Sequence, residues 1–133
     1  MIKANIVLDK KIWKKKLKKP EIYFRKKLNK LSKLSTLKNK NQEFTVMLTN
    51  NKKMKDLNSK FRNKNVSTDV LSFPLKVKLK NKLYLGDIAI SFEIINRRAK
   101  SSSFDHELDK MWIHGYLHLL GHDHKKNKDY YFM

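Results

Sequence analysis

The sequence predicts an α+β fold with one small mixed β-sheet covered by helices. Two observations lead to this prediction. Segments in which apolar and polar residues alternate, as in strands, are interleaved with segments whose apolar residues recur at steps of three and four, as in helices. The chain also has 133 residues, of which 40% are apolar, and this is enough for one modest core. We therefore expect a single domain over residues 1–133.

The first half of the chain predicts two strands and two helical regions. Ile2–Leu8 is rich in β-branched residues and predicts the first strand. A basic segment with helical spacing follows, and Pro20 restarts its helix, with the lysines on the face opposite the apolar residues. Residues 42–48 predict the second strand. Asn50 is then placed to cap a helix that ends near Arg62.

The second half predicts a β-hairpin and two further helices. Residues 70–74 are apolar enough for a short buried strand. In residues 75–80 apolar residues alternate with lysines, and Asn81-Lys82 turns the chain into residues 83–90, which gives a hairpin with one face lined by lysines. Ser91 is placed to cap a third helix over residues 92–100. A fourth helix begins after Ser103 and carries a histidine-rich segment.

Four of the five histidines lie within residues 114–124. His114 and His118 are four residues apart, so on a helix their rings share one face, about 6 Å apart along the axis. Glycine readily takes the left-handed conformation that ends a helix, so a turn at Gly121 would bring in His124 as a third ligand. Three imidazoles with an open position are typical of catalytic zinc. The sequence therefore predicts one Zn²⁺ per chain at the end of this helix, with a bound water whose pKa falls to about 7.

Other interpretations of this segment stay open. If the helix continued through Gly121, His122 would share the ligand face and become the alternative third ligand. Asp123 is interpreted as an acceptor behind the ligands or as a turn residue. The simplest alternative is that these are ordinary helix-face histidines, and His106 is interpreted as such a surface residue. Gly115 stands where H-E-x-x-H peptidases carry their general base, which disfavours peptide hydrolysis.

The charge of the chain predicts a polyanionic partner. The formal net charge is +20 and the pI is about 10.1, and residues 10–40 hold fourteen basic residues against one acid. The alternative is compositional bias, because 28 of the 32 basic residues are lysine. We expect this cluster to bind RNA through the following side chains: Lys14, Lys15, Lys16, Lys18, Lys19 and Arg25.

Arginine is rare, which draws attention to Arg62, one of four in the chain. A planar guanidinium binds phosphate bidentately, which lysine does less well. A surface arginine at a helix end is an equal alternative.

No apolar run approaches the ~20 residues of a membrane span, and the first residues lack the apolar centre of a signal peptide. Cysteine is absent, which excludes disulfides and thiolate ligands and is typical of the cytosol. We expect a cytoplasmic protein without a membrane partner.

These motifs resemble the YbeY-type single-strand-specific endoribonucleases, which are bacterial rRNA maturation factors. The match lies in His114-Gly-x-Leu-His118-Leu-x-Gly121-x-Asp123-His124. It extends to Leu57-Asn58-x-x-Phe61-Arg62 and to residues 68–74 and 85–91.

The resemblance implies zinc on His114, His118 and His124, and it implies that Arg62 lies near the scissile phosphate. It also implies a role in maturing the 3′ end of small-subunit rRNA and in ribosome quality control, with the ribosome or its small subunit as partner. The chain departs from the family in two places. His122 stands where the family usually has tyrosine. The chain also stops nine residues after His124, where the family normally continues as a helix, so either this domain is shortened at its C-terminus or the stretch is incomplete.

The resulting hypothesis is a zinc-dependent endoribonuclease with Arg62 and His114 as catalytic residues. One rival is a zinc hydrolase acting on peptides or small molecules. The other is a non-catalytic RNA-binding or ribosome-binding module whose metal is structural, with His122 as the expected fourth ligand.

Overall fold

The computed structural model of the chain describes residues 1–34, 40–62 and 70–121. Within these ranges it contains one sheet and helices on both of its faces, so the predicted α+β class is confirmed. The strands and α-helices, in chain order, are β1 (Ile2–Leu8), α1 (Pro20–Ser32), β2 (Gln42–Thr49), α2 (Asn51–Arg62), β3 (Val70–Lys78), β4 (Leu83–Ser91), α3 (Phe92–Arg98) and α4 (Phe104–Leu119). Short 3-10 helices occur at Lys11–Lys15 and Ala99–Ser101.

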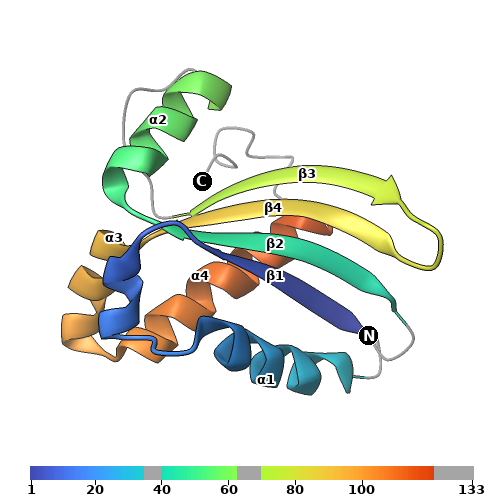
Figure 1. Cartoon of the computed structure of the whole chain (residues 1–133), viewed down its shortest axis with the longest axis horizontal. Coiled ribbons are helices and arrows are strands. Elements are labelled where there is room, and N and C mark those ends of the chain that lie inside the picture. Colours follow the sequence, from blue (N-terminus) through green and yellow to red (C-terminus); the bar gives the residue numbers. More distant parts are fainter. Residues whose placement is uncertain (35–39, 63–69, 122–133) are drawn as a thin grey trace.

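The sheet is mixed, with the strand order β1-β2-β4-β3 (Figure 1). β1, β2 and β4 are parallel, and β3 runs antiparallel to β4 as the edge strand. The register places Ile6 beside Val46 and Val46 beside Ile88, so apolar side chains form a row across one face. This face meets α1, α3 and α4 in the main core.

The main core is closed by aromatic rings from segments distant in sequence. Trp13 is fully buried and packs edge-on against Phe92 and Phe104, with ring centroids 5.4 and 5.8 Å apart. Its indole N–H donates to the carbonyl oxygen of Thr49 at 2.8 Å. Because Trp13 lies in the basic 3-10 helix Lys11–Lys15, these contacts hold that segment against the end of β2.

α2 packs on the opposite face of the sheet. Met54 is buried there with Leu71 and Ala89, and Leu57 and Phe73 pack at the margin of this smaller cluster. Successive strand residues point to opposite faces, so Leu71 and Ala89 face α2 while their neighbours enter the main core. α2 covers one end of this face, and no other helix of the described residues lies on it (Figure 1).

Several predicted boundaries were correct because their signals are local. Asn50 caps α2, with its Oδ1 accepting the backbone N–H of Lys53 at 3.0 Å. Ser103 caps α4 by accepting the backbone N–H of His106 at 3.1 Å. α1 begins at Pro20, and α2 ends at Arg62.

Two predictions about α3 were wrong. Ser91 is at its N-cap position but makes no side-chain cap. Its hydroxyl donates instead to the Oδ1 of Asn51, which ties the end of β4 to the start of α2. The α-helix also ends at Arg98, because the last residues tighten into the 3-10 helix Ala99–Ser101.

The predicted hairpin is present, but β3 has an irregularity between Pro74 and Val77. Lys76 has a φ of +51°, and Gly86, paired with Pro74, has a φ of +142°. A Cβ atom on Gly86 would lie 2.3 Å from the carbonyl oxygen of Phe73, so only glycine fits there. Beyond this point the hairpin extends past the helices, which leaves Val77 46% exposed.

In residues 1–34, 40–62 and 70–121, no helix is both long and apolar enough to cross a membrane.

Candidate active site

α4 carries His114 and His118 as predicted. His114 is exposed, and His118 is partly buried with both ring nitrogens covered from solvent. The helix ends at Leu119, and Gly121 follows with a φ of +97°, the left-handed conformation expected of a helix-terminating glycine. The backbone N–H of Gly121 donates to the carbonyl oxygen of His118 at 3.0 Å. The chain therefore turns immediately after the histidine pair.

Three interactions fix α4 along its length. Near its start, the Asp109 carboxylate accepts hydrogen bonds from the Tyr23 hydroxyl at 2.5 Å and the Lys27 ammonium at 2.9 Å, both from α1. Further along, the buried Tyr116 hydroxyl donates to the Oε1 of Gln42 at 2.7 Å. Burial raises the pKa of Tyr116 to about 12, so it stays a neutral donor at physiological pH.

Gly115 brings α4 close to the sheet. A Cβ atom at this position would lie 3.0 Å from two side-chain carbons of Ile88, which is 1% exposed. A larger residue there would require Ile88 to shift by a few tenths of an ångström within the core. Gly115 stands where H-E-x-x-H peptidases carry glutamate. In this fold that position packs directly against Ile88.

Arg62 is the last residue of α2, so its backbone position is set by how that helix is anchored. At the start of α2, the Glu93 carboxylate accepts the backbone N–H of Asn51 at 2.8 Å. One turn before the end, Asn58 is buried. The helix that presents Arg62 is thus held against the rest of the protein near both of its ends.

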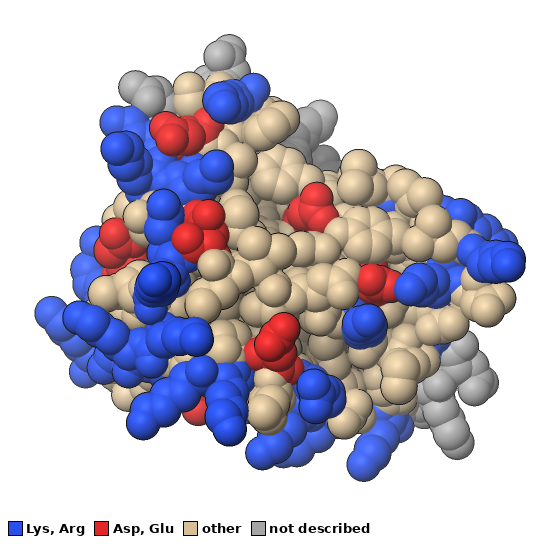
Figure 2. All heavy atoms as spheres, viewed as in Figure 1, with Lys and Arg blue, Asp and Glu red and all other residues tan. Residues whose placement is uncertain are grey.

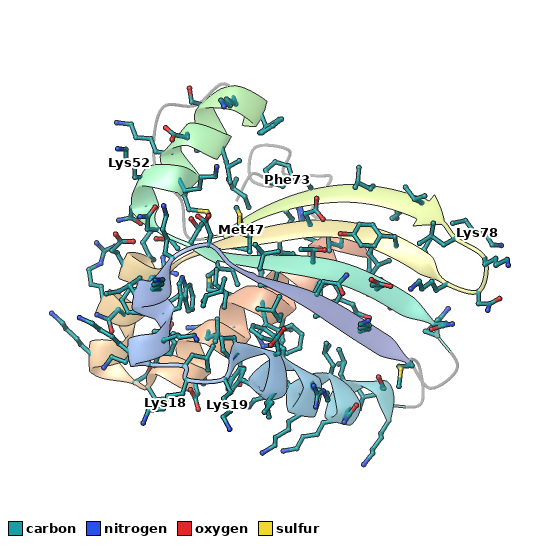
Figure 3. All side chains as sticks on the ribbon, viewed as in Figure 1. Lys18, Lys19, Met47, Lys52, Phe73 and Lys78 are labelled. Atoms are coloured by element: carbon teal, nitrogen blue, oxygen red, sulfur yellow. The ribbon has the colours of Figure 1, made fainter. Side chains whose placement is uncertain are left out.

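A groove of about 500 Å³ crosses the open face of the sheet beside α2. Phe61 and Leu57 line it from α2, and Met47 and Phe73 line it from the strands. Figure 3 labels Met47 and Phe73, which come from β2 and β3, the strands on either side of β4. The rings of Phe61 and Phe73 meet edge-on with centroids 5.6 Å apart. This groove was not predicted from the sequence, although the Phe61-Arg62 pair belongs to one of the motifs that carry the family resemblance.

Polar groups line one side of the groove. Thr45 and Asp87 are among its lining residues, and the Tyr84 hydroxyl bonds to both, donating to the Asp87 carboxylate. Burial raises the pKa of Tyr84 to about 12, and the hydrogen bond to Asp87 acts in the same direction. Tyr84 is therefore a neutral donor that holds one oxygen of Asp87.

Lys76 was not singled out from the sequence, where it was one of several alternating lysines. Its ammonium nitrogen lies 3.4 Å from the position that a Cβ atom on Gly121 would occupy, so it reaches the turn that follows α4. What distinguishes Lys76 from the other lysines is its backbone conformation. Its positive φ takes its side chain out of the normal strand alternation. A cation is also favourable at a helix C-terminus.

The predicted RNA-binding cluster lies far from this end of α4. All six of its side chains are exposed: Lys14, Lys15, Lys16, Lys18, Lys19 and Arg25. They belong to the 3-10 helix Lys11–Lys15, to the segment after it and to α1, which packs beside β1. Figure 2 shows basic side chains gathered over the 3-10 helix and α1. The sheet separates β1 from β3 by roughly 14 Å, three strand spacings.

The structure places only part of the predicted ligand set. His114 and His118 lie on α4, while His122, Asp123 and His124 fall outside the described residues. In the parts of the chain that are described, no group of three or more metal-ligating side chains comes together. His106 is exposed in the first turn of α4, as predicted for a surface residue. It is about 12 Å along the helix axis from His114.

Comparison with known proteins identifies the family of the chain. The family model described as Endoribonuclease YbeY matches residues 7–133. The chain is 45% identical to the Endoribonuclease YbeY of Pelagibacter ubique, over 98% of this chain and 88% of the relative. It is 35% identical to that of Ehrlichia canis, over 100% of this chain and 86% of the relative. The solution structure of TM1509 from Thermotoga maritima superposes with a TM-score of 0.60 at 28% identity, covering 91% of this chain and 74% of that one.

Proposed function

The chain belongs to the Endoribonuclease YbeY family and is thus an RNA-cleaving hydrolase, and we propose that it is a zinc-dependent enzyme specific for single-stranded RNA. We propose further that it acts in the cytoplasm on ribosomes or their small subunits, in maturation of the 3′ end of small-subunit rRNA and in ribosome quality control. The observation that carries the zinc proposal is the histidine pair on one face of α4, immediately before the turn at Gly121.

The donor set suits zinc. Imidazole nitrogen is a preferred zinc ligand, and two imidazoles four residues apart on a helix reach one ion. His124 is proposed as the third ligand, because a chain that reverses after Gly121 can bring it back toward His118. His122 remains the alternative, and Asp123 is proposed as an acceptor that orients a ligand ring. When bound, zinc supplies Lewis acidity and lowers the pKa of its water.

The protein's own residues would position the RNA. Arg62, at the end of α2, is proposed to hold the scissile phosphate, where a planar guanidinium stabilises developing negative charge. Lys76 adds a second cation beside the end of α4. The basic cluster at the β1 edge is proposed to bind the RNA backbone away from the cut. A chain with a net charge of +20 attracts such a polyanion over long distances.

Metal analysis of histidine variants tests the zinc proposal. Purified wild type should contain one zinc per chain, and both zinc and cleavage of a single-stranded RNA should be lost in His118→Ala and in His124→Ala. His106→Ala is the matched control, because it removes an exposed histidine from the same helix and should change neither. If His124→Ala kept its zinc and His122→Ala lost it, the third ligand would be His122 and not His124. Zinc without any cleavage by folded wild type would favour the non-catalytic binding module.

A further inference from the structure

We propose that the groove beside α2 binds an unpaired base of the RNA, with Phe61 and Phe73 as its stacking surface. This inference rests on the proposed function and deepens it, because it names how a single strand would be recognised. Phe61 is 66% exposed, which is unusual for a large apolar ring that has no role on the surface. Single exposed apolar residues are common, but here two rings from separate elements meet at one groove.

The stacking surface is held in place before any ligand arrives. Leu57 and Met54, on the preceding turns of α2, pack against Leu71 and Ala89 of the sheet. Phe73 lies in β3 and is paired through its backbone to Asp87. Since both rings sit on regular elements, little conformational freedom is lost when a base stacks on them.

The charges around the groove favour a base inside it and phosphates outside it. Asp87 lines the groove, so a phosphate placed there would meet a carboxylate in apolar surroundings. A neutral base meets no such repulsion, and a carboxylate can accept hydrogen bonds from a base edge. Outside the groove, Lys52 on α2 and Lys78 at the far end of β3 are exposed and labelled in Figure 3. Figure 2 shows the mostly uncharged open face bordered by such basic residues.

The position of the groove connects it to both parts of the proposed site. Phe61 directly precedes Arg62, so a base stacked on the ring would lie next to the proposed phosphate-binding residue. On the other side, β3 presents Phe73 to the groove, while the ammonium of Lys76 reaches the end of α4. A single strand of RNA that runs across β3 could therefore place one base in the groove and a neighbouring phosphate near the histidines. Duplex RNA could not, because its bases are stacked and paired.

Binding of single-stranded probes tests the groove without requiring cleavage. The full chain is titrated, by fluorescence anisotropy, into a short labelled oligodeoxycytidine and into an abasic oligomer of the same length. Wild type should bind the base-bearing probe more tightly. Phe61→Ala should weaken that binding by about 5-fold to about 150-fold, which corresponds to about 1–3 kcal/mol per stacked base, and should leave the abasic affinity unchanged.

Three controls separate stacking from other effects. Phe61→Tyr keeps the ring and should retain the wild-type affinity. Ile22→Ala removes an exposed apolar side chain from α1, at 38% exposure, and should bind both probes like wild type. Circular dichroism verifies that each variant is folded, which is expected for Phe61→Ala because most of the ring is in solvent.

Equal affinity of wild type for the two probes, or an equal effect of Phe61→Ala on both, would overturn the proposal. These probes need neither zinc nor an RNA bond to cut. A result showing that the groove binds no base would therefore leave the nuclease proposal to be decided by its own test.

Discussion

Replacing Gly115 by alanine tests the close approach of α4 to the sheet. At an exposed helical position this change stabilises a protein by up to about 1 kcal/mol, because alanine has the higher helix propensity. Here the added methyl would lie 3.0 Å from the Cδ1 and Cγ2 atoms of Ile88 and 3.2 Å from its Cγ1. Favourable carbon–carbon contacts lie at about 3.5–4.0 Å. The Ile88 side chain, or the helix against it, must therefore move by a few tenths of an ångström.

Overpacking of this kind costs about 1–3 kcal/mol in a dense core. Subtracting the propensity gain leaves an expected loss of up to about 2 kcal/mol for Gly115→Ala. Urea unfolding followed by tryptophan fluorescence measures this loss, because Trp13 and Trp112 are both buried in the same core. The displaced helix also carries His114, so zinc affinity should fall together with stability.

A second substitution shows whether Ile88 is the cause. Ile88→Val removes Cδ1, one of the two atoms that the new methyl would meet at 3.0 Å, and keeps the contact with Cγ2. The cost of Gly115→Ala should therefore be smaller in the Ile88→Val background, as a favourable coupling in a double-mutant cycle. If Gly115→Ala stabilised the wild-type protein by about 1 kcal/mol, as at a solvated site, the steric reasoning would be refuted.

Three further changes have defined outcomes. Gly86→Ala should destabilise the protein by more than about 2 kcal/mol in urea unfolding, because its Cβ atom would lie 2.3 Å from a carbonyl oxygen and its φ is +142°; wild-type stability would contradict the assigned bulge. Tyr84 has a pKa raised to about 12 in the folded state, so the stability from its protonated form is complete below its ordinary pKa of 10.0 and is lost as the pH rises toward 12. Thermal unfolding should show this loss in wild type and less of it in Tyr84→Phe, and identical alkaline profiles would argue against it. Lys14→Gln with Lys15→Gln should weaken RNA binding and reduce the slope of log affinity against log salt by about 0.7 for each phosphate that is no longer neutralised; an unchanged slope would remove these lysines from the proposed RNA surface.

Part of the site could be predicted from sequence because its signals lie within a few residues. The helix with His114 and His118 follows from their spacing together with the Ser103 cap at its start. Its end follows from Gly121, since only glycine enters the left-handed conformation at little cost. The family follows from the same motifs, and the match over residues 7–133 confirms it.

Features that join distant segments could not be predicted in this way. Phe61 and Phe73 come from different elements, and nothing in their local sequence says that the rings meet. The same holds for Lys76, whose approach to Gly121 depends on a bulge in the edge strand. Ser91 was predicted wrongly for the same reason. Its sequence position is that of a helix cap, but its hydroxyl bonds to Asn51 and joins β4 to α2.

By itself, the sequence determined the kinds of element, most of their boundaries, the histidine pair and the strong positive charge. Each of these depends on neighbouring residues or on composition alone, so no knowledge of packing is needed. Only the tertiary structure decided the strand order, the contact of Gly115 with Ile88, the groove beside α2 and the separation of the basic cluster from the end of α4. These depend on how helices cross a twisted sheet, and that is set by the close packing of side chains far apart in the chain.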